Sequence, residues 1–230
     1  MPTTFLNVQD RINLDYLNRT DLTNETKRAI IRAVRHYEKE RFWFNQTATS
    51  IALSTASVGL ALPSDFLALD FVTVRVTSPA SADNIVVMRA FDRIAYRNRS
   101  LVSGAPEEVA IMNNQLKFTP KPDSAYNVTV YYLHSLTTLS ADADTNDWLS
   151  AAEDLIVHHA AADMLANVLR APADQVASHK QWEMEAYALL QYGRNIRMMT
   201  GEDSGFQGAL HRQVIAAKKT DGGPLPQTGG

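Results

Sequence analysis

The sequence predicts an α+β fold in which a four-helix layer carries an inserted antiparallel β-sheet or barrel-like domain and an extended C-terminal arm. Near both ends of the chain, apolar residues recur with the period of about 3.6 residues that is typical of an amphipathic helix. Between them, short β-branched runs alternate with turn residues. The last thirty residues hold seven of the ten glycines. We therefore expect a helical domain from residues 1–45 and 145–200, an inserted β domain from 46–144, and a flexible arm from 201–230.

Two helices are expected at the N-terminus. The first covers Phe5 to Leu17, and a polar break follows from Asn18 to Asp21. The second begins near Thr23 and has an apolar stripe that faces a partner element, with a basic face opposite. The apolar stripe consists of Ala29, Ile30, Ala33, Val34 and Tyr37. The basic face consists of Lys27, Arg28, Arg32, Arg35, Lys39 and Arg41.

Three consecutive aromatic residues, Phe42, Trp43 and Phe44, close the second helix, and Phe66 follows a Leu-Pro-Ser-Asp run at the start of a strand. A bulky apolar block at the change from helical to strand periodicity marks the junction of two layers. We expect these four aromatic residues to pack between the helices and the sheet. A base-stacking platform is the alternative, but consecutive residues at a helix end point in different directions.

Seven strands are expected in the inserted region. Asn113 and Asn114 predict a two-residue hairpin turn, because asparagine tolerates positive φ. Pro120 and Pro122 restrict the next segment to a loop or a sheet edge, and residues 91–97 are expected to form a short helix. The expected strands are Ser50 to Leu53, Gly59 to Leu62, Phe71 to Val76, Ile85 to Met88, Glu108 to Met112, Gln115 to Phe118 and Asn127 to Tyr132.

Two further helices are expected after the sheet. Asn146 or Asp147 can cap the first, which is rich in alanine and ends before Pro172. The last helix spans about Ala173 to Met199. One face of it is predicted to carry His179, Trp182, Ala186, Leu189, Gly193 and Ile196.

Composition excludes several classes of function. The formal net charge is -3, so the chain lacks the basic excess of a protein that grips nucleic acid. Cysteine is absent, which removes disulfides, thiolate nucleophiles and cysteine-based metal sites. The N-terminus has no secretory pattern, and no apolar run reaches the roughly 20 residues of a membrane span. We expect a soluble protein that is made in the cytoplasm and binds no membrane.

No motif predicts catalysis, a cofactor or a metal. His158 and His159 each have a carboxylate one turn away, Asp154 and Asp163 respectively. Adjacent histidines point about 100° apart on a helix, and no metal-binding helix motif is present. We expect one histidine in a helix seam and the other at its edge. The glycine spacing of nucleotide-binding loops and of the serine nucleophile elbow is also missing.

The basic face of the second helix, with a second cluster at Arg93, Arg97 and Arg99, allows two interpretations. It could bind a phosphate backbone in a salt-sensitive, sequence-blind manner. The interpretation we favour is an interface with acidic residues of another subunit, because the chain is acidic overall. The candidate acidic residues are Glu153, Asp154 and Glu183.

The C-terminal arm carries apolar residues that are spaced as an anchor for another surface: Phe206, Leu210, Val214 and Ile215. Thirty residues extended at about 3.3 Å each could reach on the order of 100 Å. We expect the arm to dock onto a partner rather than to pack alone, since its glycine content disfavours an independent core.

Residues 29–45, AIIRAVRHYEKERFWFN, and residues 62–66, LPSDF, resemble the head-to-tail adaptor proteins of short-tailed bacteriophages. The layout of helical pair, β insertion, helical return near Trp148 and glycine-rich arm is similar over nearly the whole chain. The resemblance implies a virion protein of the tail or neck, made in the host cytoplasm. It implies a ring of twelve copies below the portal that extends the DNA channel, passes DNA without reading its sequence, and receives the tail nozzle and tail fibres. It gives no catalytic residue.

Two other functions remain open. Another phage tail component, a tube or nozzle subunit, would have the same cysteine-free composition, and stoichiometry and position in a particle would separate it from an adaptor. A nucleic-acid-binding protein that uses the basic helix would show strong, salt-dependent DNA affinity.

Overall fold

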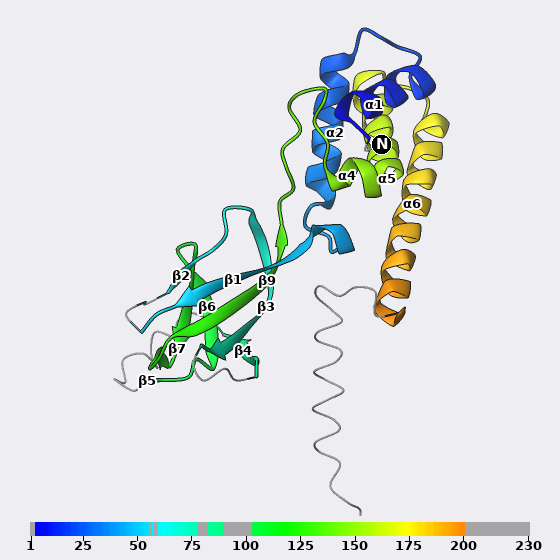
Figure 1. The fold of residues 1–230 in the computed structure, drawn as a ribbon. Helices are drawn as coiled ribbons and strands as arrows, with labels where there is room; N and C mark the ends of the chain where they lie inside the picture. The colour runs from blue at the N-terminus through cyan, green and yellow to red at the C-terminus, as the bar shows by residue number, and fades with distance from the viewer. Residues whose placement is uncertain (1–2, 56, 58, 78–81, 90–102, 201–230) are drawn as a thin grey trace, which may run out of the picture.

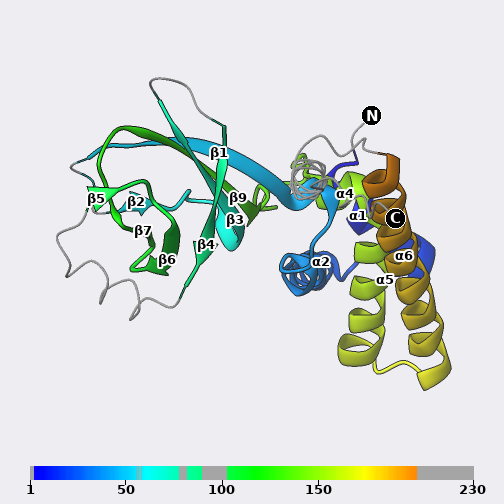
Figure 2. The same cartoon turned by 90° about the horizontal axis from the view of Figure 1, so that it is seen from below.

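The computed structural model describes residues 3–55, 57, 59–77, 82–89 and 103–200, and over these the chain is an α+β protein (Figure 1). N-terminal and C-terminal helices form one layer, and the strands between them form a curved sheet that nearly closes into a barrel (Figure 2). The predicted fold class is confirmed. The predicted helix at 91–97 and the C-terminal arm lie outside the described residues.

The first predicted helix forms and changes its winding halfway. It begins as α1 (Phe5–Asp10) and continues as a π-helix, η1 (Arg11–Tyr16). The hydroxyl of Thr4 caps α1 by accepting the N–H of Asn7 at 3.2 Å. The predicted polar break follows, and Asn18 within it adopts a φ of 49°. The second helix, α2, spans Thr23–Tyr37.

The prediction that the aromatic block closes α2 is wrong, because the helix ends at Tyr37. Asn45 is the physical reason. Its Oδ1 accepts the N–H of Phe42 at 2.9 Å, and its Nδ2 donates to the carbonyl of Glu40 at 2.7 Å. The Phe42 N–H is therefore bound outside the helical pattern, and Trp43–Asn45 forms a short 3₁₀ turn, η2, which leads directly into the sheet.

A side chain caps the first of the C-terminal helices. Asn146, rather than Asp147, caps α4 (Asp147–Ala151) by accepting the N–H of Leu149 at 3.2 Å. The helix is then interrupted at Ala152, and α5 (Glu153–Asp163) follows. A π-helical turn, η3 (Met164–Val168), extends α5, and α6 spans Ala173–Thr200 after Pro172.

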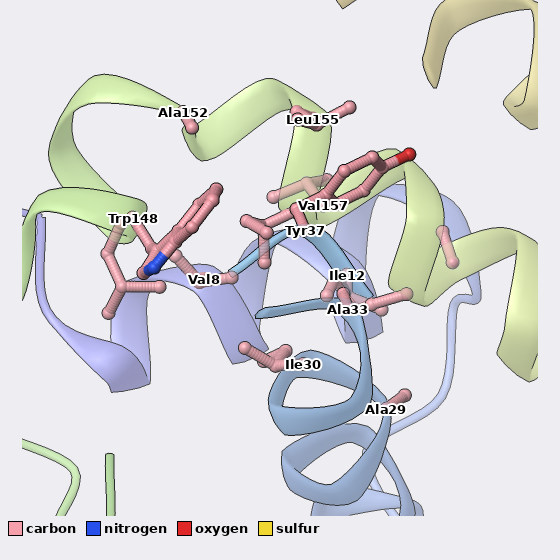
Figure 3. Close-up of a cluster of buried hydrophobic side chains, with 14 of the residues drawn as sticks. Val8, Ile12, Ala29, Ile30, Ala33, Tyr37, Trp148, Ala152, Leu155 and Val157 are labelled. Carbon is pink, nitrogen blue, oxygen red and sulfur yellow. The ribbon is translucent and has the colours of Figure 1, made fainter. Parts of the chain in front are cut away.

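The helical core lies around α5, which is buried on nearly every side. Alanines at 160 and 161 let α2 and α6 approach it closely, and these two helices lie on opposite sides of it in both views (Figures 1 and 2). The predicted stripe of α2 faces this core, with Val34 only partly buried. Figure 3 shows Ala29, Ile30, Ala33 and Tyr37 gathered there with Trp148.

The sheet contains all seven predicted strands with shifted ends. Their order is β1-β9-β3-β4-β6-β7-β2, and a separate pair joins β5 (Ser103–Gly104) to β8 (Lys121–Pro122). Asn113 and Asn114 form the predicted turn, with φ values of 50° and 57°. The seven strands are β1 (Gln46–Leu53), β2 (Leu60–Ala61), β3 (Phe66–Val76), β4 (Asn84–Met88), β6 (Glu108–Met112), β7 (Gln115–Thr119) and β9 (Tyr126–His134).

One strand pair of this sheet departs from the expected antiparallel arrangement. Strands β4 and β6 run parallel, with Val87 opposite Glu108, whereas the other pairs in the sheet are antiparallel. The connection between them is long, as a parallel crossover requires, and a tight hairpin would have forced the antiparallel direction.

The helices and the sheet have separate hydrophobic clusters. The segment before α4 already packs with the helices, since Leu139 is buried in their cluster and the carbonyl of Asp144 accepts the N–H of Phe5 at 2.8 Å. The division of the chain into two domains stays a prediction.

Candidate functional site

The seam between α5 and α6 brings two histidines together. His158 and His179 are buried, and their Nδ1 atoms lie 3.3 Å apart. The rings of Tyr16 and Trp182 cover the pair, with centroids 4.9 Å from His179 and 5.3 Å from His158 respectively. The sequence predicted that one of His158 and His159 lies in a helix seam, and the structure identifies it as His158. The pairing with His179 needed the fold, since the two residues are on different helices.

His159 is the histidine that lies at the edge of this seam. Its Nδ1 contacts Oε1 of Glu183 at 2.8 Å, and the hydroxyl of Tyr37 donates to the same carboxylate. Burial alone would raise the pKa of Glu183, but the contacts from His159 and Tyr37 outweigh it and lower the pKa below its ordinary value. This cluster therefore joins α2, α5 and α6.

The carboxylates that the sequence placed beside these histidines bind arginines instead. Asp154 accepts Arg11 at 2.7 Å, and Asp163 pairs with Arg32 of α2. A guanidinium always carries a full positive charge and presents several donors to a carboxylate, so arginines on neighbouring helices compete well for these side chains. Across the residues that the structure describes, no group of three histidines and carboxylates is placed to hold a metal ion.

Acid should weaken this seam. Burial lowers the pKa of both His158 and His179. A folded-state pKa below the unfolded value of about 6.5 means that the unfolded chain takes up protons first. The contribution of this pair to the free energy of unfolding should thus have its full value above about pH 6.5 and should fall as the pH drops below that value. Urea unfolding between about pH 7.5 and 5.5 measures this slope, and the His179→Asn variant should have a shallower one. An equal slope in the variant would exclude the pair as the cause.

Some cations of the predicted basic face form ion pairs with carboxylates of the same chain, and others form none among the described residues. Lys27 binds Asp142 at 2.7 Å, and Arg32 binds Asp163. Within the described ranges, no hydrogen bond or ion pair is recorded for three exposed cations. They are Arg28, Arg35 and Lys39.

The acidic residues expected to meet the basic face from another subunit are bound within their own chain. Glu153 and Asp154 both accept Arg11 at 2.7 Å, and Glu183 is held by Tyr37 and His159. These carboxylates thus already have partners within the chain, and their contact with another subunit stays a prediction. The second basic cluster, at 93–99, lies outside the described residues.

The aromatic block lies at the base of the helical core. Phe42 is fully buried, stacks on Phe44 at 5.4 Å and meets the edge of Trp148 at 5.5 Å. Trp43 contacts Phe44 at 5.3 Å. Phe66 instead stacks on Tyr132 within the sheet, at 5.6 Å.

An ion pair between an exposed arginine and a buried carboxylate, which sequence reasoning missed, connects the junction to the sheet. Arg41 pairs with Asp70, whose side chain is buried in β3 at an irregularity in its pairing with β9. Burial raises the pKa of Asp70, and the positive charge of Arg41 opposes that rise. A lone carboxylate within the apolar run of β3 was the signal that could have identified it.

The predicted apolar face of α6 is only partly buried. The helix packs on the core through residues that include Val176, His179, Ala186 and Leu190. Two residues predicted for the same face are exposed, Trp182 by 42% and Leu189 by 71%. The reason is that α6 has a neighbour on one side only, so it buries a narrow stripe. The burial of Gly193 and of Ile196 lies outside what the structure describes.

Comparison with known proteins gives the identity of the chain. Residues 3–213 match the family model described as SU10 adaptor protein. No curated protein matches the chain. In the part of the chain that the structure describes, every helix is too short or too polar to cross a membrane. The family match covers nearly the whole sequence and agrees with the layout of helices, curved sheet and returning helices. The chain therefore belongs to the SU10 adaptor protein family and is a structural, head-to-tail adaptor of a phage.

Proposed function

We propose that the protein forms a ring of twelve copies below the portal, where it extends the DNA channel and attaches the tail nozzle and tail fibres. Family membership over residues 3–213 is the observation that carries this proposal. The helical domain, residues 1–45 and 145–200, forms the ring, and the β domain, residues 46–144, presents the tail-facing surface. A layer with α2 and α6 on opposite sides of α5 suits a ring, because a closed ring needs two different contact faces on each subunit (Figure 2).

The junction residues keep the two parts of each subunit in a constant orientation. Phe42, Trp43, Phe44 and Phe66 lie close to the point where the chain passes from α2 into β1, and the Arg41 to Asp70 ion pair crosses it. With a rigid junction, every copy in the ring would hold its tail-facing sheet at the same distance from the helical layer.

The arm, residues 201–230, docks onto the portal or a neighbouring copy through Phe206, Leu210, Val214 and Ile215. An arm that becomes ordered on binding loses chain entropy, so its affinity comes from a few buried anchors and from repetition around the ring. DNA passes through the channel without specific binding, which agrees with a net charge of -3.

Electron microscopy of the protein mixed with portal particles of the same phage tests the proposal. We expect a ring of twelve copies on the tail side of the portal, coaxial with its channel. A protein found further along the tail, or in another copy number, would identify a tube or nozzle subunit instead. Filter binding at low and high salt gives an independent check, since strong salt-dependent DNA retention would favour a nucleic-acid-binding protein.

A further inference from the structure

The outer side of α6 exposes apolar residues that the described structure covers only in part. Trp182, Leu189 and Tyr192 are 42%, 71% and 64% exposed, and their spacing places them along one side of the helix. They extend over about 15 Å at 1.5 Å per residue. Glu185 lies among them, and the Gln181 amide, at 3.1 Å, is its recorded partner among the described residues. We call these four residues the α6 flank.

The outer side of α2 has complementary chemistry. Arg28 and Arg35 lie two turns apart on the face of α2 that points away from the core, Lys39 follows in the turn after the helix, and all three are exposed. We call them the α2 flank. Arginine stacks on the faces of tryptophan and tyrosine and binds carboxylates in a fork, and the aliphatic stems of arginine and lysine cover apolar surface. The α2 flank can thus satisfy both the aromatic residues and the carboxylate of the α6 flank.

We propose that the α6 flank of one copy packs against the α2 flank of the next copy, and that this contact closes the ring. The inference rests on the ring proposed above and names its interface. Both flanks belong to one chain and lie on opposite sides of α5 (Figures 1 and 2). In an open row of copies, the first copy therefore has one unpaired flank and the last copy has the complementary unpaired flank. That is the condition for a head-to-tail ring.

Charge selects this pairing over a symmetric dimer. Two α6 flanks face to face would place Glu185 near Glu185, and two α2 flanks would place three cations against three. Like charges facing each other in an interface disfavour the complex, whereas the mixed contact brings opposite charges together.

Cysteine cross-linking tests the contact directly, because the chain contains no cysteine. The Arg35→Cys and Leu189→Cys variants are mixed in equal amounts, assembled on portal particles and treated with a short bis-maleimide. We expect a covalent dimer from the mixture and none from either variant alone. The matched control replaces Leu189→Cys with Met184→Cys, because Met184 is 65% exposed but lies on a different side of α6. That mixture should give no dimer.

Charge exchange provides the second test. Arg35→Glu alone should weaken assembly of the ring on the order of tenfold, because the new carboxylate would lie against Glu185 of the next copy. The double variant Arg35→Glu with Glu185→Arg should restore assembly, which a merely misfolded variant could not do. Both sites are exposed, so circular dichroism should show an intact fold in each case.

The outcomes separate this inference from the proposed function. Rings that assemble on the portal but yield no cross-link, or that tolerate Arg35→Glu alone, would overturn the interface and leave the ring standing. Cross-linking of the Leu189→Cys variant to a portal or tail component would overturn it as well. Wild-type protein that forms no ring on portal particles would overturn both.

Discussion

Replacing Trp148 with alanine should lower the free energy of unfolding by about 3–5 kcal/mol, the usual cost of removing a large aromatic side chain from a packed core. Trp148 is only 1% exposed. The rings of Phe42 and Phe44 meet it edge to face at 5.5 and 4.9 Å. Its removal would leave a cavity where α4 packs against the aromatic block. Urea unfolding followed by circular dichroism measures the change.

Trp182→Ala is the matched control for this prediction. It removes the same side chain from a position that is 42% exposed, so the loss should be about 1 kcal/mol. Equal losses for the two variants would contradict the central role of Trp148. A stable Trp148→Ala protein would mean that the helices can close around the missing ring.

Deleting residues 201–230 should abolish attachment to portal particles while leaving the folded body as stable as the full chain. The described helices and strands already bury two hydrophobic clusters without the arm. The four apolar residues of the arm, in contrast, are expected to find their partners on another protein. Co-sedimentation of the shortened protein with portal particles, together with its thermal unfolding, measures both effects.

Point variants within the full-length chain make the same test more specific. Phe206→Ser with Leu210→Ser should reduce attachment nearly as much as the deletion, because the arm's affinity depends on a few buried anchors. Gln213→Ser in the same arm should attach normally. Undiminished attachment by the shortened protein would refute the arm as the docking element, and the ring interface would then have to provide all of the affinity.

Local chemistry was enough to predict several elements. Asn113 and Asn114 tolerate positive φ, so the hairpin between β6 and β7 could be placed with its strands nearly correct. Asn146 before Trp148 marked the start of α4, and Pro172 marked the break before α6. The amphipathic stripe of α2 identified the residues that face the core. Each of these signals acts within a few residues of the chain.

Other features depend on residues that are distant in sequence. The partners of Asp154 and Asp163 are arginines from the N-terminal helices, 143 and 131 residues away. Periodicity could indicate that α6 has an apolar side, but not that its neighbours, which all lie on one side of it, would leave Trp182 and Leu189 exposed. Each outcome depends on which helix lies beside which.

The sequence by itself determined the α+β class, the positions of most helices and strands, and the resemblance to phage adaptors, because local propensity and periodicity depend on near neighbours. Only the tertiary structure decided which charges are satisfied inside the chain and which remain on its two flanks. That division depends on how helices pack in three dimensions. The acidic residues that the sequence offered to a neighbour are bound internally, whereas Glu185 and the α2 cations lie at the surface, where a second copy can reach them.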